Sequence, residues 1–315
     1  MKIETRGNTN RGKETVLTTS DRESIFHSST GLIFSILAAI SLVIWWRALT
    51  STLALALRDD KYTHILLILP VSVALIFVDW EAQEPFTGVG LSIGSGLLVA
   101  SVLVTVVVRS GAISLHPDEQ LSLNMVALVV WWGGAFIFCF GTRAFRRALF
   151  PLGFLLWLVP LPDSLLSPII RLLQEGSAIS ARVLFAAVGI PVAQNGTQLS
   201  IPGLTMEVAR ECSSIRSSLM LVVTTMVIAQ TLMRTTWRKA VVIALAIPLS
   251  VAKNGLRIFV LAMLATRVDR TFLTGRLHHQ GGIIYFLIAL AVICLLIWVA
   301  RRGEERRSVS APTSR

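Results

Sequence analysis

The chain has 315 residues, a formal net charge of +11, 54% hydrophobic residues and only 15% charged residues. Together with a mean hydropathy of +0.71, this composition excludes an ordinary soluble protein and predicts an integral membrane protein. The basic residues punctuate apolar runs, so the expected partners are membrane lipids and not nucleic acid. Three scattered cysteines predict neither a disulfide framework nor a metal site, and no organic cofactor is indicated.

Several apolar runs are long enough to cross about 30 Å of hydrocarbon. They predict an all-α polytopic membrane protein with about eight transmembrane helices, near 31–49, 64–80, 89–108, 121–140, 148–161, 213–233, 240–265 and 281–300. Pro248 is expected to kink the seventh helix. The polar ends, 1–29 and 302–315, are predicted to be disordered tails on either side of a transmembrane domain over 30–301.

Residues 162–211 interrupt the pattern of apolar spans. Apolar residues recur at helical spacing over 162–189, which predicts an amphipathic helix at the membrane surface. Two turn signals follow, Asn195-Gly196 and Pro202-Gly203, and they predict a hairpin and short strands over 191–208. We therefore expect a small helix-plus-β-hairpin insert.

Basic residues between the apolar runs indicate the orientation of the chain. They gather near 143–147, 234–239 and 301–307, which favours the cytoplasm for these segments. With eight spans, both tails are then cytoplasmic, while the 162–211 insert and the 266–280 loop lie outside. The prediction is a multi-pass protein of the inner or plasma membrane.

Cys212 lies in unusually polar company directly before the sixth run. Two serines after it are helix-start signals, and Arg216 follows one turn later. A helix N-terminus and a nearby arginine both favour the thiolate, which is the nucleophile. The alternative is a small core residue. Arg216 either tunes the thiolate or pairs with Glu207 or Glu211.

Two further reactive groups are expected at the same depth. Arg257 lies 18 residues after Lys239, about 27 Å along a helix, with Asn254 on the same face. An arginine within an apolar span is a functional candidate, or else a structural ion pair or a snorkelling side chain. His278 and His279 precede the eighth run at its outer end. The predicted topology thus places a thiol, a guanidinium and an imidazole at the same depth on the outer side of the membrane.

These three groups suit acyl transfer, in which Cys212 attacks a carbonyl, a histidine moves the protons and arginine stabilises the tetrahedral oxyanion. Three alternatives stay open. The protein is a purely hydrolytic protease, a non-enzymatic transporter or scaffold in which Cys212→Ala is silent, or a thiol–disulfide enzyme, which the lack of a second nearby cysteine disfavours.

Three boxes resemble the exosortase/archaeosortase family of membrane-embedded cysteine transpeptidases. They read EVARECSSIRS over 207–217, NGLRI over 254–258 and HHQGG over 278–282, and segments 62–70, 158–168 and 189–203 are also similar to the family. The resemblance implies that Cys212 is the nucleophile, Arg257 the transition-state stabiliser and His278 the general acid and base. His278 is preferred over His279 because only His278 has a glycine four residues on, Gly282. Ser214 replaces the family's usual glycine.

The resemblance also implies a function. Such enzymes cleave C-terminal sorting tails (PEP-CTERM-like) of exported proteins at the outer membrane–water interface and transfer the proteins to a surface acceptor. We expect Arg216, Asn254, Glu207, Gly282 and His64 to support the site. The 162–211 insert is hypothesised to form the wall that binds the motif of the tail.

Overall fold

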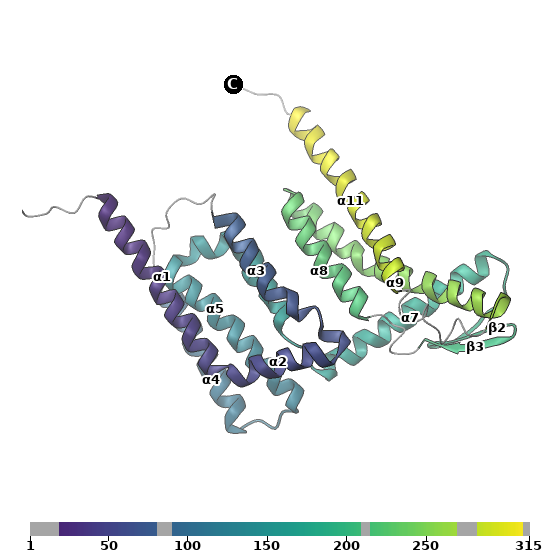
Figure 1. The fold of residues 1–315 in the computed structure, drawn as a ribbon, viewed down its shortest axis with the longest axis horizontal. Coiled ribbons are helices and arrows are strands. Elements are labelled where there is room, and N and C mark those ends of the chain that lie inside the picture. Colours follow the sequence, from purple (N-terminus) through teal and green to yellow (C-terminus); the bar gives the residue numbers. More distant parts are fainter. Residues whose placement is uncertain (1–18, 81–89, 209–214, 270–281, 311–315) are drawn as a thin grey trace, which may run out of the picture. The chain divides into compact units, whose positions relative to one another are not determined.

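The computed structural model describes residues 19–80, 90–208, 215–269 and 282–310 (Figure 1). The chain forms two compact units. The first unit consists of Met1–Leu49, Ala74–Ile113 and Leu123–Leu156, and the second consists of Thr50–Val73, Ser114–Ser122 and Trp157–Arg315.

Helices dominate the described residues. In chain order they are α1 (Thr19–Ile44), α2 (Trp46–Arg58), the 3-10 turn η1 (Asp60–Tyr62), α3 (Ile65–Trp80), α4 (Leu91–Ser110), α5 (Pro117–Arg147), α6 (Leu149–Phe154), the 3-10 turn η2 (Leu155–Leu158), α7 (Asp163–Ala187), α8 (Ile215–Leu232), α9 (Thr236–Arg267) and α11 (Gly282–Ser310). Three short strands lie between α7 and α8, namely β1 (Ala193–Asn195), β2 (Gln198–Ile201) and β3 (Leu204–Glu207).

The predicted class, a helical multi-pass membrane protein with a small insert, is confirmed. Within the described residues, α4, α5, α8, α9 and α11 are long and apolar enough to cross a membrane. The number rises from five to seven if two bent pairs each count as one span, and the sequence predicted about eight. Three predicted spans account for the difference, because the run at 31–49 is bent by 72° between α1 and α2. α3 has only 16 residues, and the run at 148–161 is bent by 94° from α7.

Several helix ends differ from the predicted ones. The run at 31–49 is not one straight helix, because α1 and α2 meet at a bend of 72°. α1 begins at Thr19, inside the predicted tail 1–29, and α11 continues to Ser310, inside the predicted tail 302–315. Charged residues such as Glu and Arg propagate helices well, so the helix does not stop where the apolar run stops.

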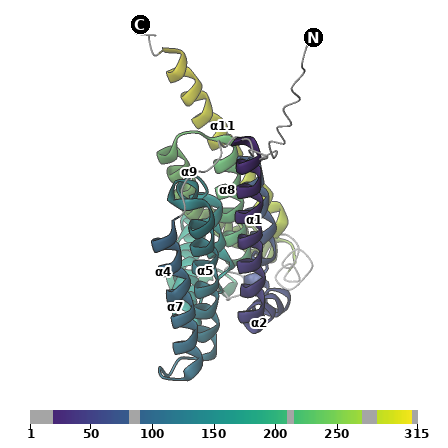
Figure 2. The ribbon, with the colours of Figure 1, turned by 90° about the vertical axis from the view of Figure 1, so that its left-hand side faces the viewer.

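In the first unit α1, α4 and α5 lie side by side (Figures 1 and 2). Trp131 of α5 donates its indole N–H to the Leu37 carbonyl of α1 at 3.0 Å. Gly94 of α4 lies so close to α5 that an added Cβ would be 2.6 Å from the Phe138 Cα. This unit contains none of the predicted site residues.

In the second unit the sheet packs against α7 and α9. Phe185 of α7, Leu199 of β2 and Ile258 of α9 share one buried core. The strands form an antiparallel meander in the order β1-β2-β3. The insert predicted from the sequence therefore rests on the helix that carries Arg257.

The two turns of this sheet test the sequence prediction directly. Pro202-Gly203 is the second turn, as predicted, with Gly203 at φ +82°. The first turn is Gly196-Thr197, because Asn195 pairs with Gln198. The predicted Asn195-Gly196 turn was therefore wrong by one residue. Gly196, at φ +59°, takes the first central position, where tight hairpins need a positive φ.

Candidate active site

The Asn254–Ile258 box lies in α9 at a close contact with α7. Asn254 is 1% exposed and donates its Nδ2 to the Ser177 Oγ of α7 at 2.9 Å. A Cβ added to Gly255 would lie 2.5 Å from the Ser180 Cβ, so only glycine allows this approach of the two helices. Arg257, one turn on from Lys253, is buried at 8% exposure. The asparagine and glycine thus fix the helix that carries the guanidinium.

Lys253 is a buried cation of α9 that the sequence analysis did not single out. It is only 7% exposed, and its Nζ donates to the Ser217 Oγ of α8 at 2.5 Å. Its ammonium ties the first turn of α8 to α9. The signal in the sequence was a lysine within an apolar span, which marks a functional candidate as much as an arginine does.

The chain is firmly held where it enters the 209–214 segment. The Val208 N–H donates to the Thr197 carbonyl at 3.0 Å, and Gln174 of α7 donates to the Val208 carbonyl at 2.8 Å. Val208 itself is 2% exposed. Glu207, predicted to support the site, ends β3 and is exposed.

Ile215 holds the chain where it leaves the same segment. It is 5% exposed and packs in a cluster with Leu166 and Ile170 of α7 and with Tyr62. The described residues on either side of 209–214, Val208 and Ile215, are therefore both buried and packed.

Arg216 pairs with a residue that the sequence analysis did not consider. Its Nη1 lies 2.8 Å from the Asp60 Oδ1 of η1, and both side chains are more than half exposed. The predicted pairing with Glu207 is therefore wrong. The prediction failed because the actual partner, Asp60, lies 156 residues away in the sequence, and a local sequence pattern gives no signal for such a distant contact. The alternative partner, Glu211, lies outside the described residues.

The segment around η1 lies next to the start of α8. The Tyr62 hydroxyl donates to the Leu161 carbonyl at 3.0 Å. Burial, aided by the nearby charge of Asp163, raises the pKa of Tyr62 to about 12. These contacts hold the turn that supplies Asp60 to Arg216.

His64 follows in the same segment, just before α3. It is 6% exposed, its Nδ1–H donates to the Lys61 carbonyl at 3.1 Å, and its ring meets Trp157 edge-on. Burial lowers the pKa of His64, so its ring is neutral near pH 7. Its described contacts orient the segment that carries Asp60.

Two of the three predicted catalytic residues are not among the described residues. Cys212 lies in 209–214, and His278 lies with His279 in 270–281. Gly282 is the first residue of α11, and no described atom lies within 4 Å of a Cβ added to it. Arg257 is thus the member of the trio whose surroundings the structure describes.

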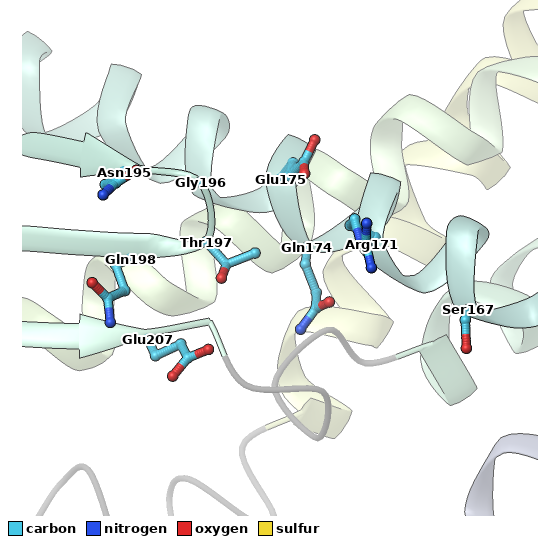
Figure 3. Close-up of a pocket in the computed structure, with 9 residues that line it drawn as sticks. All are labelled: Ser167, Arg171, Gln174, Glu175, Asn195, Gly196, Thr197, Gln198 and Glu207. Carbon is cyan, nitrogen blue, oxygen red and sulfur yellow. The ribbon is translucent and has the colours of Figure 1, made fainter.

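A polar groove lies between α7 and the sheet, with a volume of about 650 Å³. Figure 3 shows its walls, which are α7 on one side and the β1–β2 turn with the end of β3 on the other. The lining residues are Ser167, Arg171, Gln174, Glu175, Asn195, Gly196, Thr197, Gln198 and Glu207. Most are charged or carry amides, so the groove offers hydrogen bonds and not an apolar surface.

Comparison with known proteins gives a family. Residues 45–295 match the family model described as Transmembrane exosortase (Exosortase_EpsH), and this match covers most of the chain and all three boxes. No curated protein and no solved structure matches the chain. The buried asparagine, glycine and arginine of α9 lie within the matched region, and the chain belongs to the transmembrane exosortase family.

Proposed function

We propose that the protein is a membrane cysteine transpeptidase that cleaves the C-terminal sorting tails of exported proteins and passes the proteins to a surface acceptor. Membership of the exosortase family supports a membrane transpeptidase or protease role in general. In this proposal Cys212 is the nucleophile, Arg257 stabilises the transition state and His278 is the general acid and base. The single observation that carries it is the common depth of Arg257 and the starts of α8 and α11.

The depth of Arg257 relative to α8 follows from two hydrogen bonds. Lys239 Nζ bonds to Gln230 Oε1 at 2.8 Å, and Lys253 Nζ bonds to Ser217 Oγ at 2.5 Å, which together fix the antiparallel register of α8 and α9. Arg257 lies four residues beyond Lys253. Because the helices are antiparallel, the corresponding position on the α8 side is four residues before Ser217, at 213, which is next to Cys212. The register therefore supports a thiol at the level of the guanidinium.

The register of α11 gives an independent argument. Arg238 of α9 donates to the Ala300 carbonyl of α11 at 2.6 Å, and Ala246 and Ile293 share a buried core. The two helices therefore run antiparallel. Arg257 lies 19 residues beyond Arg238, and 19 residues before Ala300 is position 281, directly before α11. His278 is three residues from that position, which supports an imidazole at the same level.

The chemistry follows from these three groups. His278 takes the thiol proton as the Cys212 sulfur attacks the scissile carbonyl, and Arg257 stabilises the negative oxygen of the tetrahedral intermediate. The C–N bond then breaks, the imidazolium gives its proton to the leaving amine, and a thioester remains on the sulfur. An amine or hydroxyl of the acceptor attacks the thioester, loses its proton to His278 and releases the thiol. Water in the same role gives hydrolysis.

The groove of Figure 3 is proposed to bind the short motif of the sorting tail, and its residues come from the 162–211 insert. Glu207 lines it and lies five residues before Cys212 in the sequence. Its amides and charges suit a polar peptide segment just outside a membrane anchor. Replacing Gln194–Leu199 with a glycine-serine loop of equal length should abolish binding and cleavage of a tail. Intact binding and cleavage would contradict this role.

The experiment for the proposed activity uses an exported reporter with a tail made of a Pro-Glu-Pro motif, a transmembrane helix and a basic end. The reporter is expressed with the wild type, Cys212→Ala, Arg257→Gln, His278→Ala or His279→Ala. We expect processing to be lost in the first three variants and retained in His279→Ala, the matched control. A transporter or scaffold would process the tail equally with Cys212→Ala, and the mass of the mature C-terminus separates transfer from hydrolysis.

A further inference from the structure

Strand β3 forms one edge of the three-stranded sheet. In the described sheet the order is β1-β2-β3, so β3 pairs with β2 on one side only. The Val208 N–H donates to the Thr197 carbonyl at 3.0 Å, which makes Thr197 and Val208 a hydrogen-bonded pair. Opposite residues of antiparallel strands alternate between bonded and non-bonded pairs, so Thr205 and Glu207 lie at the non-bonded positions. Their backbone N–H and C=O groups therefore point away from β2.

These outward backbone groups have no hydrogen-bond partner among the residues that the structure describes. The described hydrogen bond of Thr205 outside the ladder joins its side chain to the Ser200 hydroxyl, at 3.3 Å. Thr205 and Glu207 are both exposed, whereas Leu204 and Met206 between them pack against the core. The edge thus offers two N–H donors and two C=O acceptors in a row. Such an edge is a template for another extended chain.

The spacing of the outward groups fits an extended polypeptide. Alternate residues of a strand recur about every 7 Å, and any extended peptide presents its own donors and acceptors at the same repeat. The edge also reaches the polar groove between α7 and the sheet, because Glu207 belongs to both (Figure 3). A chain that pairs with β3 therefore passes the amides and charges that line the groove.

We propose that the edge of β3 binds the tail of the exported protein as an added fourth strand, through the backbone of Thr205 and Glu207. This inference rests on the proposed function, because the bound chain is the sorting tail. Pairing along a strand edge supplies affinity through main-chain hydrogen bonds, while neighbouring pockets supply specificity for side chains. The edge holds the tail extended, and the groove selects its motif.

A second copy of this chain is the other occupant for such an edge. β3 has only four residues, and very short edge strands are one means by which proteins avoid edge-to-edge pairing. A specific interface between proteins buries roughly 1,200 Å² or more, which is far beyond what one short strand supplies. The tail brings further contacts through its motif and its transmembrane helix, so we assign the edge to the tail.

Hydrogen exchange of the backbone amides tests the inference. The full-length Cys212→Ala protein, which should hold the tail without cleaving it, is placed in lipid nanodiscs with and without a saturating amount of the Pro-Glu-Pro reporter. We expect the amides of 204–207 to exchange about fivefold more slowly with the reporter, because the two outward N–H groups gain acceptors. The amides of β2 are the internal reference, since β2 already has a neighbour on each side.

A proline variant tests the same edge by affinity. Thr205→Pro removes the outward N–H and keeps the ladder to β2, because proline is tolerated where the N–H faces away from the sheet. It is compared with Thr205→Ala, which loses the same hydroxyl and keeps the N–H. We expect Thr205→Pro to bind the reporter about fivefold more weakly than Thr205→Ala. If thermal unfolding shows that Thr205→Pro has lost its fold, the exchange measurement decides.

Three results would overturn the inference. The first is a reporter that binds without slowing exchange over 204–207. The second is a folded Thr205→Pro protein that binds as tightly as Thr205→Ala. The third is slow exchange that appears without the reporter as the number of copies per nanodisc rises, which would assign the edge to a second copy. Failure of the proposed function looks different, because the reporter would then not bind, or Cys212→Ala would cleave it at the wild-type rate.

Discussion

Asn254 of α9 donates a 2.9 Å hydrogen bond to Ser177 of α7, and both side chains are almost fully buried. This bond joins the helix that carries Arg257 to the helix that supports the sheet. We predict that Ser177→Ala lowers the free energy of unfolding by about 1–3 kcal/mol, because it deprives a buried amide of an acceptor. Thermal or denaturant unfolding in detergent measures the change.

The matched control for this prediction is Ser250→Ala. Ser250 is equally buried in α9, but its hydroxyl donates to the Ile247 carbonyl of its own helix. We expect a loss within about 0.5 kcal/mol, since no contact between helices is removed. Equal losses in the two variants would mean that the contact between Asn254 and Ser177 adds nothing.

Gly255 is predicted to tolerate no side chain. In Gly255→Ala the new Cβ would lie 2.5 Å from the Ser180 Cβ, so α7 and α9 must separate. Overpacking of this kind costs about 1–3 kcal/mol, and it should reduce tail processing because Arg257 moves with α9. Gly96→Ala is the control, because nothing lies within 4 Å of its added Cβ. A Gly255→Ala protein as stable and active as Gly96→Ala would refute the close packing.

The ion pair between Arg216 and Asp60 is predicted to matter little for stability. It is exposed, and exposed pairs contribute between zero and about 1 kcal/mol. Asp60→Asn should therefore shift the unfolding midpoint only slightly and leave processing close to the wild-type rate. If Arg216→Gln instead stops processing while Asp60→Asn does not, Arg216 acts on the thiol and not through this pair.

Tyr62 should make stability depend on pH in the alkaline range. Burial first, then the charges of Asp163, Asp59 and Asp118, raises the pKa of Tyr62 from 10.0 to about 12. The unfolded chain loses this proton first, so the stabilising contribution is complete below pH 10 and is lost as the pH rises toward 12. Tyr62→Phe should weaken this dependence.

The measurement is the unfolding midpoint between about pH 9 and 11.5, compared for the parent and Tyr62→Phe. Tyr285→Phe is made in both proteins, because the chain has only two tyrosines and Tyr62 is then the only phenol that titrates. A phenolate absorbance that appears near pH 10 in the folded protein would contradict the raised pKa.

Local patterns predicted the fold class, the amphipathic helix at α7 and the turn at Pro202-Gly203, because each depends on periodicity or on turn chemistry within a few residues. They failed where distant segments decide the outcome. The pairing of Arg216 with Asp60 joins segments that lie 156 residues apart in the sequence. The predicted position of the first hairpin turn was wrong by one residue, because Asn195 and Gly196 are both residue types that suit a tight turn.

For the candidate site, the sequence singled out Arg257 and Asn254, which are both buried in α9, and it predicted one depth for three reactive groups. It did not single out Lys253, although this lysine lies within the predicted span 240–265. Only its burial and its bond to Ser217 distinguish it from a snorkelling side chain.

The most direct test of the central claim is to trap the covalent intermediate. Purified full-length protein in lipid nanodiscs is mixed with the Pro-Glu-Pro reporter, quenched in acid and digested, and the peptide that contains Cys212 is weighed by mass spectrometry. We predict an added mass equal to the cleaved reporter fragment, which hydroxylamine removes and Cys212→Ala never shows. Processing of the reporter by Cys212→Ala at the wild-type rate, with no adduct on the wild type, would contradict the account.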